Sequence, residues 1–278
     1  PHEDGSGAII HGVLPRRSSI SRKAAWLAVE EQVLGANIDV VFLVAGLDGD
    51  LNLRRLERYL ATVWDSGSEP VVVLSKADLC DDVNAALAAV GAVAIGVPVH
   101  VVSGLTGEGI EDLEPYLAGH RTVALLGSSG VGKSTLINRL RGEDVQAVAD
   151  VRRDGRGRHT TTTRELVRLP GGGLLLDTPG IRELQLWDVG EGFDATFGDV
   201  ESLVEQCRFS DCAHNGEPGC AVQAALADGT LERGRFASYQ KLQRELHALA
   251  VKQDKRLQAE ARKARRRMGR ARRHPKRW

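Results

Sequence analysis

The chain has 278 residues, of which 42% are hydrophobic, and it carries 37 acidic side chains and 37 Lys or Arg side chains. This length and apolar content predict a globular protein with a sizeable core and about two domains. No uninterrupted apolar stretch approaches the ~18 residues that a membrane span needs, so we expect no membrane partner and a cytoplasmic location.

The formal net charge of zero hides an uneven distribution of charge. Residues 252–278 hold 13 Lys or Arg and two acidic residues, so this tail carries about +11 and the rest of the chain about −11. Blocks of like charge usually form solvated faces or disordered arms. A basic arm on an acidic body is also typical of nucleic-acid-binding proteins, and we favour this interpretation because so many cations repel one another without a polyanion.

The predicted elements begin with residues 1–20, which are too few for a domain and contain an apolar run at 7–14 that indicates a strand. Strands and helices then alternate in this order: strand 38–44, helix 52–64, strand 70–74, helix 83–90, strand 97–102, helix 109–117, strand 122–126, helix 135–140, and a hairpin of 165–169 with 173–176. Such alternation predicts an α/β fold with a mostly parallel sheet that is covered on both faces. Beyond residue 187 the composition changes, and 231–267 is a long charged helical pattern in a separate helical module.

The octapeptide GSSGVGKS, residues 127–134, has the form G-x-x-x-x-G-K-[ST] and lies between a predicted strand and a predicted helix. A phosphate loop needs this context, because glycines turn the backbone tightly and a helix then presents its free N–H groups to the anion. In such a loop Lys133 reaches the β- and γ-phosphates and the Ser134 hydroxyl ligates Mg²⁺. The alternative is a Gly/Ser-rich turn that matches by chance. The nucleotide-binding candidates here are Gly127, Ser128, Ser129, Gly130, Val131, Gly132, Lys133, Ser134 and Thr135.

Two further segments suit a nucleotide switch. Asp177-Thr178-Pro179-Gly180 follows an apolar strand, where the Asp would hold Mg²⁺ through water and the Gly180 N–H would meet the γ-phosphate. The polar stretch 157–163 contains four consecutive threonines, of which we take Thr161 as the one whose hydroxyl completes the Mg²⁺ shell. The alternative for this stretch is a Thr-rich strand edge.

Recognition of the base needs a carboxylate that accepts from guanine N1 and N2 and a Lys stem along the ring. Ser75-Lys76-Ala77-Asp78 follows a predicted strand and resembles the N/T-K-x-D guanine element. The loop 102–109 follows the next strand and resembles the one that contacts guanine O6, with Ser103 and Gly104 as its candidates. Together the two elements favour a GTPase, and Asp78 argues against the rival prediction of a P-loop ATPase.

Cys207, Cys212, His214 and Cys220 lie within 14 residues. Three thiolates and an imidazole suit a closed, tetrahedral, structural Zn²⁺ site. The zinc would contribute folding free energy that so short a loop cannot obtain from burial. The alternative is a set of reduced core cysteines beside a surface His.

The order of these motifs is unusual, because the base elements precede the phosphate loop. In this order the chain resembles the circularly permuted GTPases, and specifically the ribosome small-subunit-dependent GTPase A family of bacterial 30S assembly factors. The segments that carry the resemblance are 14–18, 75–78, 127–135, 157–162, 177–180 and the Cys/His cluster. Serine at position 75, where Asn or Thr is more usual, leaves open one scaffolding hydrogen bond.

The resemblance implies the domains. It places a circularly permuted P-loop GTPase domain at 21–188 and a zinc-binding helical domain with the basic tail at 189–278. An N-terminal OB barrel would be largely absent, with 1–20 as a remnant or its last strand.

The resemblance also implies the function. It indicates an enzyme that hydrolyses GTP to GDP and phosphate, uses Mg²⁺ and one structural Zn²⁺, and is stimulated by the 30S subunit during late maturation. The expected partners are the 30S subunit and 16S rRNA, and we expect a monomer. The rival from another class is an RNA-binding zinc protein whose P-loop domain is a scaffold with little turnover.

Hydrolysis needs a residue that orients water. Ras uses a Gln shortly after D-x-x-G, but Ile181 follows Gly180 here and cannot do so. The resemblance implies a substitute from the switch loop, and His159 is the nearest polar candidate, with Lys133 and Thr161 as the other catalytic candidates. The alternative is that His159 is a solvated switch residue.

Overall fold

The structure, a computed structural model, describes residues 11–23, 31–142, 165–177 and 190–253. Its largest element is a six-stranded sheet in the order β5-β4-β3-β6-β8-β7. The strands are β3 (Val40–Gly46), β4 (Glu69–Ser75), β5 (Val99–Val101), β6 (Thr122–Leu126), β7 (Glu165–Arg168) and β8 (Leu174–Asp177). All neighbours are parallel except β7 and β8, which form the predicted hairpin. The predicted mostly parallel α/β sheet is therefore confirmed.

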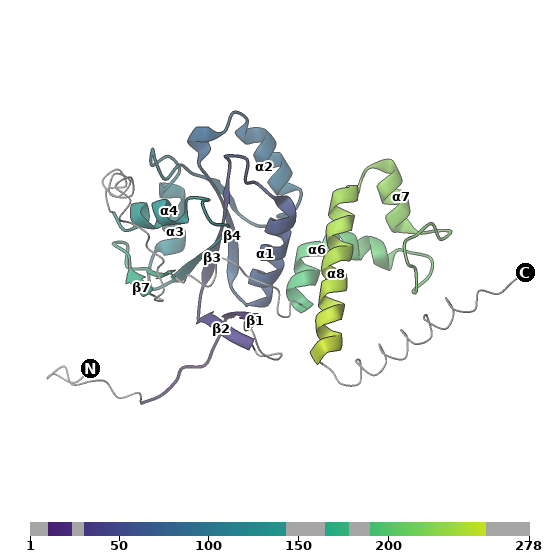
Figure 1. The fold of residues 1–278 in the computed structure, drawn as a ribbon, viewed down its shortest axis with the longest axis horizontal. Helices are drawn as coiled ribbons and strands as arrows, with labels where there is room; N and C mark the ends of the chain where they lie inside the picture. Colours follow the sequence, from purple (N-terminus) through teal and green to yellow (C-terminus); the bar gives the residue numbers. More distant parts are fainter. Residues whose placement is uncertain (1–10, 24–30, 143–164, 178–189, 254–278) are drawn as a thin grey trace, which may run out of the picture.

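The helices cover both faces of this sheet (Figure 1). They are α1 (Leu53–Asp65), α2 (Val83–Gly91), α3 (Glu114–Leu117) and α4 (Lys133–Leu140), with short 3₁₀ turns η1 (Ala77–Leu79) and η2 (Glu111–Leu113). Because successive strand residues point to opposite faces, β3 supplies Val41 and Leu43 to the core under α1 and α2, and Val40 and Phe42 to the core under α3 and α4. Both faces of β3 are buried, which explains why its sequence is a continuous apolar run.

The chain leaves β3 toward β4 and β5 on one side and then returns to place β6 on the other side of β3. In open α/β sheets ligands bind outside the carboxyl ends of the strands where the winding reverses in this way. The described residues of the predicted nucleotide motifs all follow carboxyl ends at this edge, after β4, β5, β6 and β8.

The sequence prediction was wrong at the N-terminal side. Residues 11–14 are not in a strand, because Val13 and Leu14 are 88% and 79% exposed and have no sheet to pack on. The chain instead forms an unpredicted antiparallel ribbon of β1 (Ser19–Lys23) and β2 (Glu31–Ala36). Residues 7–10 lie outside the described part of the chain.

The region 109–117 was predicted as one helix and is instead a 3₁₀ turn followed by the four-residue α3. The reason is Gly109, whose φ of +71° is left-handed and where a Cβ would collide with the carbonyl oxygen of Val101. Such a residue cannot begin a helix, so the helical turn starts only after it.

The C-terminal module consists of α6 (Gly190–Glu205), α7 (Ala221–Asp228) and α8 (Arg233–Gln253). It has its own apolar core around Phe193, Phe197, Phe236 and Tyr239, which includes Ala61 from α1. Figure 1 shows α6 and α8 beside α1. No helix among the described residues is long and apolar enough to span a bilayer.

Candidate functional site

The phosphate loop turns sharply between β6 and α4. A Cβ on Gly127 would collide with the carbonyl oxygen of Val44, and Gly130 and Gly132 have φ of +85° and +93°, so glycine is needed at each. Lys133 is 7% exposed, and its Nζ donates to the carbonyl oxygen of Gly127 at 2.6 Å and to that of Ser128. The ammonium thus lies inside the curl of the loop, beside the N-terminus of α4, as phosphate binding requires.

Ser75 joins the base element to the phosphate loop. Its buried hydroxyl donates to the carbonyl oxygen of Val131 at 2.6 Å and lies 3.2 Å from that of Ala45. The scaffolding hydrogen bond that serine left open at this position is therefore made. The approach to Ala45 follows from the pairing of β3 with β4, in which Gly46 lies opposite Ser75.

Asp78 is oriented by the neighbouring base loop. Ser103 is fully buried, and its hydroxyl donates to Asp78 Oδ1 at 2.5 Å. The same hydroxyl oxygen accepts from the backbone N–H of Thr106 at 3.1 Å, and the Ser103 carbonyl accepts from the N–H of Gly107 at 2.8 Å. This network fixes the orientation of the Asp78 carboxylate, which lines a cavity beside the phosphate loop.

A cavity of about 240 Å³ lies between the base elements and the end of the phosphate loop with α4. A Cβ on Gly104 would lie 3.1 Å from Thr135 Cγ2, so glycine lets this loop approach α4 closely. Leu79 and Leu105 are 61% and 55% exposed at the rim, where they could cover the faces of a planar base. Sequence reasoning missed both leucines, although Leu79 directly follows the 75–78 element and Leu105 lies inside the 102–109 loop. The lining residues are Ser75, Lys76, Asp78, Leu79, Val102, Gly104, Leu105, Gly132, Thr135 and Leu136.

Some predicted site residues are not placed. Asp177 ends β8 at the same edge of the sheet, but only its backbone is described. Gly180, His159 and Thr161 lie outside the described residues. Their roles toward Mg²⁺, the γ-phosphate and water stay predictions.

The predicted zinc ligands come together. The ligand atoms of Cys207, Cys212, His214 and Cys220 all lie within 4.8 Å of one another. The Sγ atoms of Cys207 and Cys220 are 3.8 Å apart, and His214 Nδ1 lies 3.6 and 3.5 Å from them. Zn–S bonds of about 2.3 Å in a tetrahedron require S···S edges of about 3.8 Å. The donor set therefore fits zinc.

Residues that are not metal ligands hold the ligand loop in place through hydrogen bonds. Gln223 donates its backbone N–H to Cys220 Sγ at 3.4 Å and its side-chain N–H to the His214 carbonyl oxygen at 2.5 Å. The Glu217 carboxylate accepts from the backbone N–H groups of Ala213 and Asn215 at 3.1 and 2.7 Å. Hydrogen bonding to its own backbone N–H, and then to those of Asn215 and Ala213, lowers the pKa of Glu217. The surrounding bonds thus orient the ligand loop, as they do in structural metal sites.

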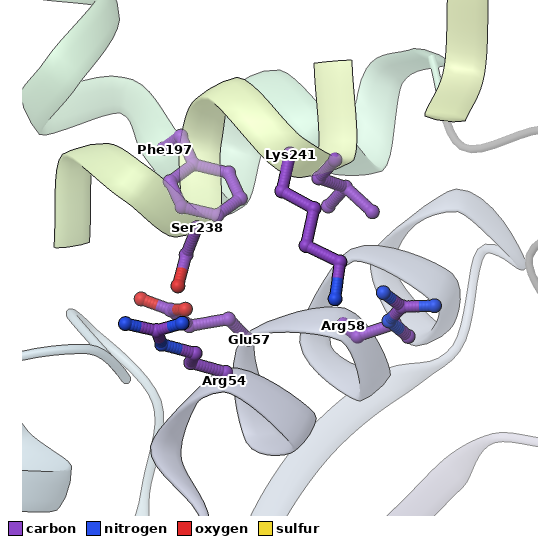
Figure 2. A pocket seen from close by; sticks show the side chains of 7 residues that line it. Arg54, Glu57, Arg58, Phe197, Ser238 and Lys241 are labelled. Atoms are coloured by element: carbon purple, nitrogen blue, oxygen red, sulfur yellow. The ribbon is translucent and has the colours of Figure 1, made fainter. Parts of the chain in front are cut away.

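A second, smaller cavity of about 40 Å³ lies at the junction of the two modules, between α1 and the helices α6 and α8 (Figure 2). Next to it the Arg235 side chain, 5% exposed, donates to Glu57 Oε1 at 2.7 Å and to Asp199 Oδ1 at 2.8 Å. Glu57 Oε2 and Ser238 Oγ are buried and have no hydrogen-bond partner among the described residues. The junction is therefore polar and closely packed, and nothing in the sequence pattern had indicated it.

Fold and site together define a circularly permuted P-loop GTPase domain. The structure of YjeQ from Thermotoga maritima is similar, with a TM-score of 0.63 and 31% identity over 88% of this chain and 81% of that one. YloQ, described as a circularly permuted GTPase, has a TM-score of 0.57 and 25% identity over 85% and 82% of the two chains. The predicted permutation is confirmed.

The chain belongs to the RsgA GTPase family, whose model matches residues 13–187. A small ribosomal subunit biogenesis GTPase RsgA from Opitutus terrae is 56% identical over 85% of this chain and 65% of its own length. RsgA 2 from Lactiplantibacillus plantarum is 50% identical over 86% of this chain and 67% of its own length. The chain thus spans about two thirds of the length of these curated relatives.

Proposed function

We propose that this protein binds GTP, hydrolyses it to GDP and phosphate, and does so faster on the small ribosomal subunit during late 30S maturation. The observation that carries the proposal is the cavity in which Asp78, oriented by Ser103, lies beside the phosphate loop. The curated relatives are named small ribosomal subunit biogenesis GTPases, which supports the choice of partner. A cytoplasmic monomer that contacts 16S rRNA completes the proposal.

Binding would follow from the site's own geometry. The loop amides and Lys133 would hold the phosphates, and Asp78 would accept from guanine N1 and N2. Ser134, with Asp177 and Thr161, would ligate Mg²⁺, which neutralises charge that develops on the transferred phosphoryl group. His159 would position the attacking water.

The structural role of zinc is part of the same proposal. Cys207, Cys212, His214 and Cys220 would hold one Zn²⁺, and all four ligand positions would belong to the protein, which leaves no open position for catalysis. The metal would fix the ligand loop against the core of the C-terminal module.

Phosphate release tests the proposal directly. We expect slow GTP turnover by the purified protein and turnover at least about tenfold faster with purified 30S subunits, because a partner that completes the catalytic site of a GTPase accelerates hydrolysis strongly. The assay compares 30S with 50S subunits at equal concentration. No phosphate release with either would favour the RNA-binding scaffold.

The same assay tests whether His159 positions the attacking water or is a solvated switch residue. With His159→Ala, we expect GDP affinity to stay near that of the wild type and 30S-stimulated turnover to fall by about 100-fold, the usual contribution of a residue that assists proton or water positioning. Near-native stimulated turnover would remove His159 from the mechanism and leave the rest of the proposal intact.

Asp78→Asn should change which base is bound. An amide cannot accept both guanine N–H groups, so we expect GDP affinity to fall by about 10- to 100-fold and affinity for xanthosine diphosphate to rise. Asp81→Asn, an exposed neighbour, is the matched control. Equal affinity of the wild type for ADP and GDP would instead favour an ATPase.

A further inference from the structure

Lys76, the second residue of the base element, is held by a carboxylate that no motif had indicated. Its backbone is left-handed, with φ of +62°, and its side chain lines the nucleotide cavity. Its Nζ forms an ion pair with Asp48 Oδ2, and the two side chains are 27% and 29% exposed. Asp48 lies just beyond the end of β3 and reaches the cavity only through Lys76, which is a lining residue.

The backbone around Asp48 is arranged for this contact. The N–H of Leu47 donates to the carbonyl oxygen of Ser75 at 2.9 Å, which ties the loop after β3 to the base element. A Cβ on Gly46 would lie only 2.5 Å from Asp48 Oδ1, so glycine leaves the space that the carboxylate occupies. The same Cβ would lie 3.8 Å from Lys76 Cδ, so both features bring the Asp48 carboxylate and the Lys76 stem together.

Charge supports the same arrangement. The hydrogen bond from Lys76 lowers the pKa of Asp48, so the carboxylate is ionised at neutral pH. A lysine stem has several rotatable bonds, and a free one would lose much conformational freedom when it packed against a base. A stem that is already held loses less on binding.

We propose that Asp48 is a positioning residue, which holds the Lys76 stem along the wall of the cavity where the guanine ring would lie and thereby slows the dissociation of guanine nucleotides. The proposal rests on the proposed function, because it assumes that the cavity holds guanine. Asp48 itself touches neither the base nor the reacting phosphate in this scheme. Its effect passes entirely through Lys76.

The dissociation rate of fluorescently labelled GDP from the full chain tests this, with four proteins compared: wild type, Asp48→Asn, Lys76→Met and the double variant. We expect Asp48→Asn to speed dissociation by about three- to tenfold, as suits a partly buried ion pair. The double variant should match Lys76→Met alone, because Asp48 has nothing to act on once Lys76 is gone.

Two further variants separate positioning from general destabilisation. Asp48→Glu keeps the charge and should restore at least half of the lost residence time. Asp112→Asn removes an exposed carboxylate of the same charge and should leave dissociation unchanged.

The inference is overturned if Asp48→Asn releases GDP within about 1.5-fold of the wild-type rate, or if the effects of Asp48→Asn and Lys76→Met multiply fully in the double variant. Failure of the wild type to bind GDP would overturn the proposed function instead, and this outcome is visible before any variant is compared.

Discussion

Arg235→Ala should lower the free energy of unfolding by about 3–5 kcal/mol, because it removes one partner of a buried ion pair and leaves the other charge behind. The guanidinium is 5% exposed and faces a Glu57 carboxylate that is 3% exposed. It also donates to the Thr196 carbonyl oxygen at 2.6 Å and packs over the Phe197 ring at 4.5 Å. These contacts join α8 and α6 to α1. The substitution should therefore weaken the packing of the C-terminal module against α1.

Thermal and urea unfolding measure this effect. We expect a fall in melting temperature of about 10 °C, since 1 kcal/mol corresponds to about 2–4 °C in a protein of this size. Arg233→Ala, an exposed arginine on the same helix, should change the melting temperature by less than about 2 °C.

A paired substitution identifies the cause. Replacing Glu57 and Arg235 together with methionine removes both charges and should recover most of the stability, because Asp199 is 32% exposed and can be solvated by itself. A double variant no more stable than Arg235→Ala would show that packing, rather than the unpaired charge, dominates.

Cys212→Ser should release the zinc and unfold the ligand loop together with part of α7. Structural zinc sites contribute about 10–16 kcal/mol of apparent binding free energy in small zinc peptides, far more than a loop of this size gains from burial. Cys207, Cys212 and Cys220 also belong to the apolar core around Phe236, so loss of the metal should loosen that core.

The zinc content of the purified protein and its circular dichroism spectrum measure this change. The wild type should hold one zinc per chain and lose helicity when a strong chelator removes it. Cys80→Ala, at a half-buried cysteine packed against the core of the parallel sheet, is the control and should retain the metal. Full zinc content in Cys212→Ser would remove Cys212 from the ligand set.

Local motifs made the nucleotide and metal sites predictable from sequence. Gly127–Ser134 and Cys207–Cys220 each keep their functional groups within a few residues, so their spacing already encodes the geometry. Asp78 and Ser103 were predicted as candidates because each follows an apolar strand, and parallel strands bring their carboxyl ends to one edge.

The remaining features depend on contacts that are distant in sequence. Glu57 and Arg235 are separated by 178 residues, and each alone is an ordinary charge on an amphipathic helix. Asp48 and Lys76 meet only because β3 and β4 are neighbours in the sheet. The ribbon of β1 and β2 was missed because the segments SISRK and EQVLGA contain few large apolar residues and no continuous apolar run.

The strand order also has a consequence for synthesis on the ribosome. β3 pairs with β4 soon after both are made, but Val40 pairs on its other side with Val123, about 80 residues later. At about 5–20 residues per second, that edge of β3 waits roughly 4–16 s for its neighbour. During this interval the nascent chain contains β3, β4 and β5, and the apolar strand β3 is an unpaired edge strand. The strand that leads into the phosphate loop is thus the one that covers the open edge of β3.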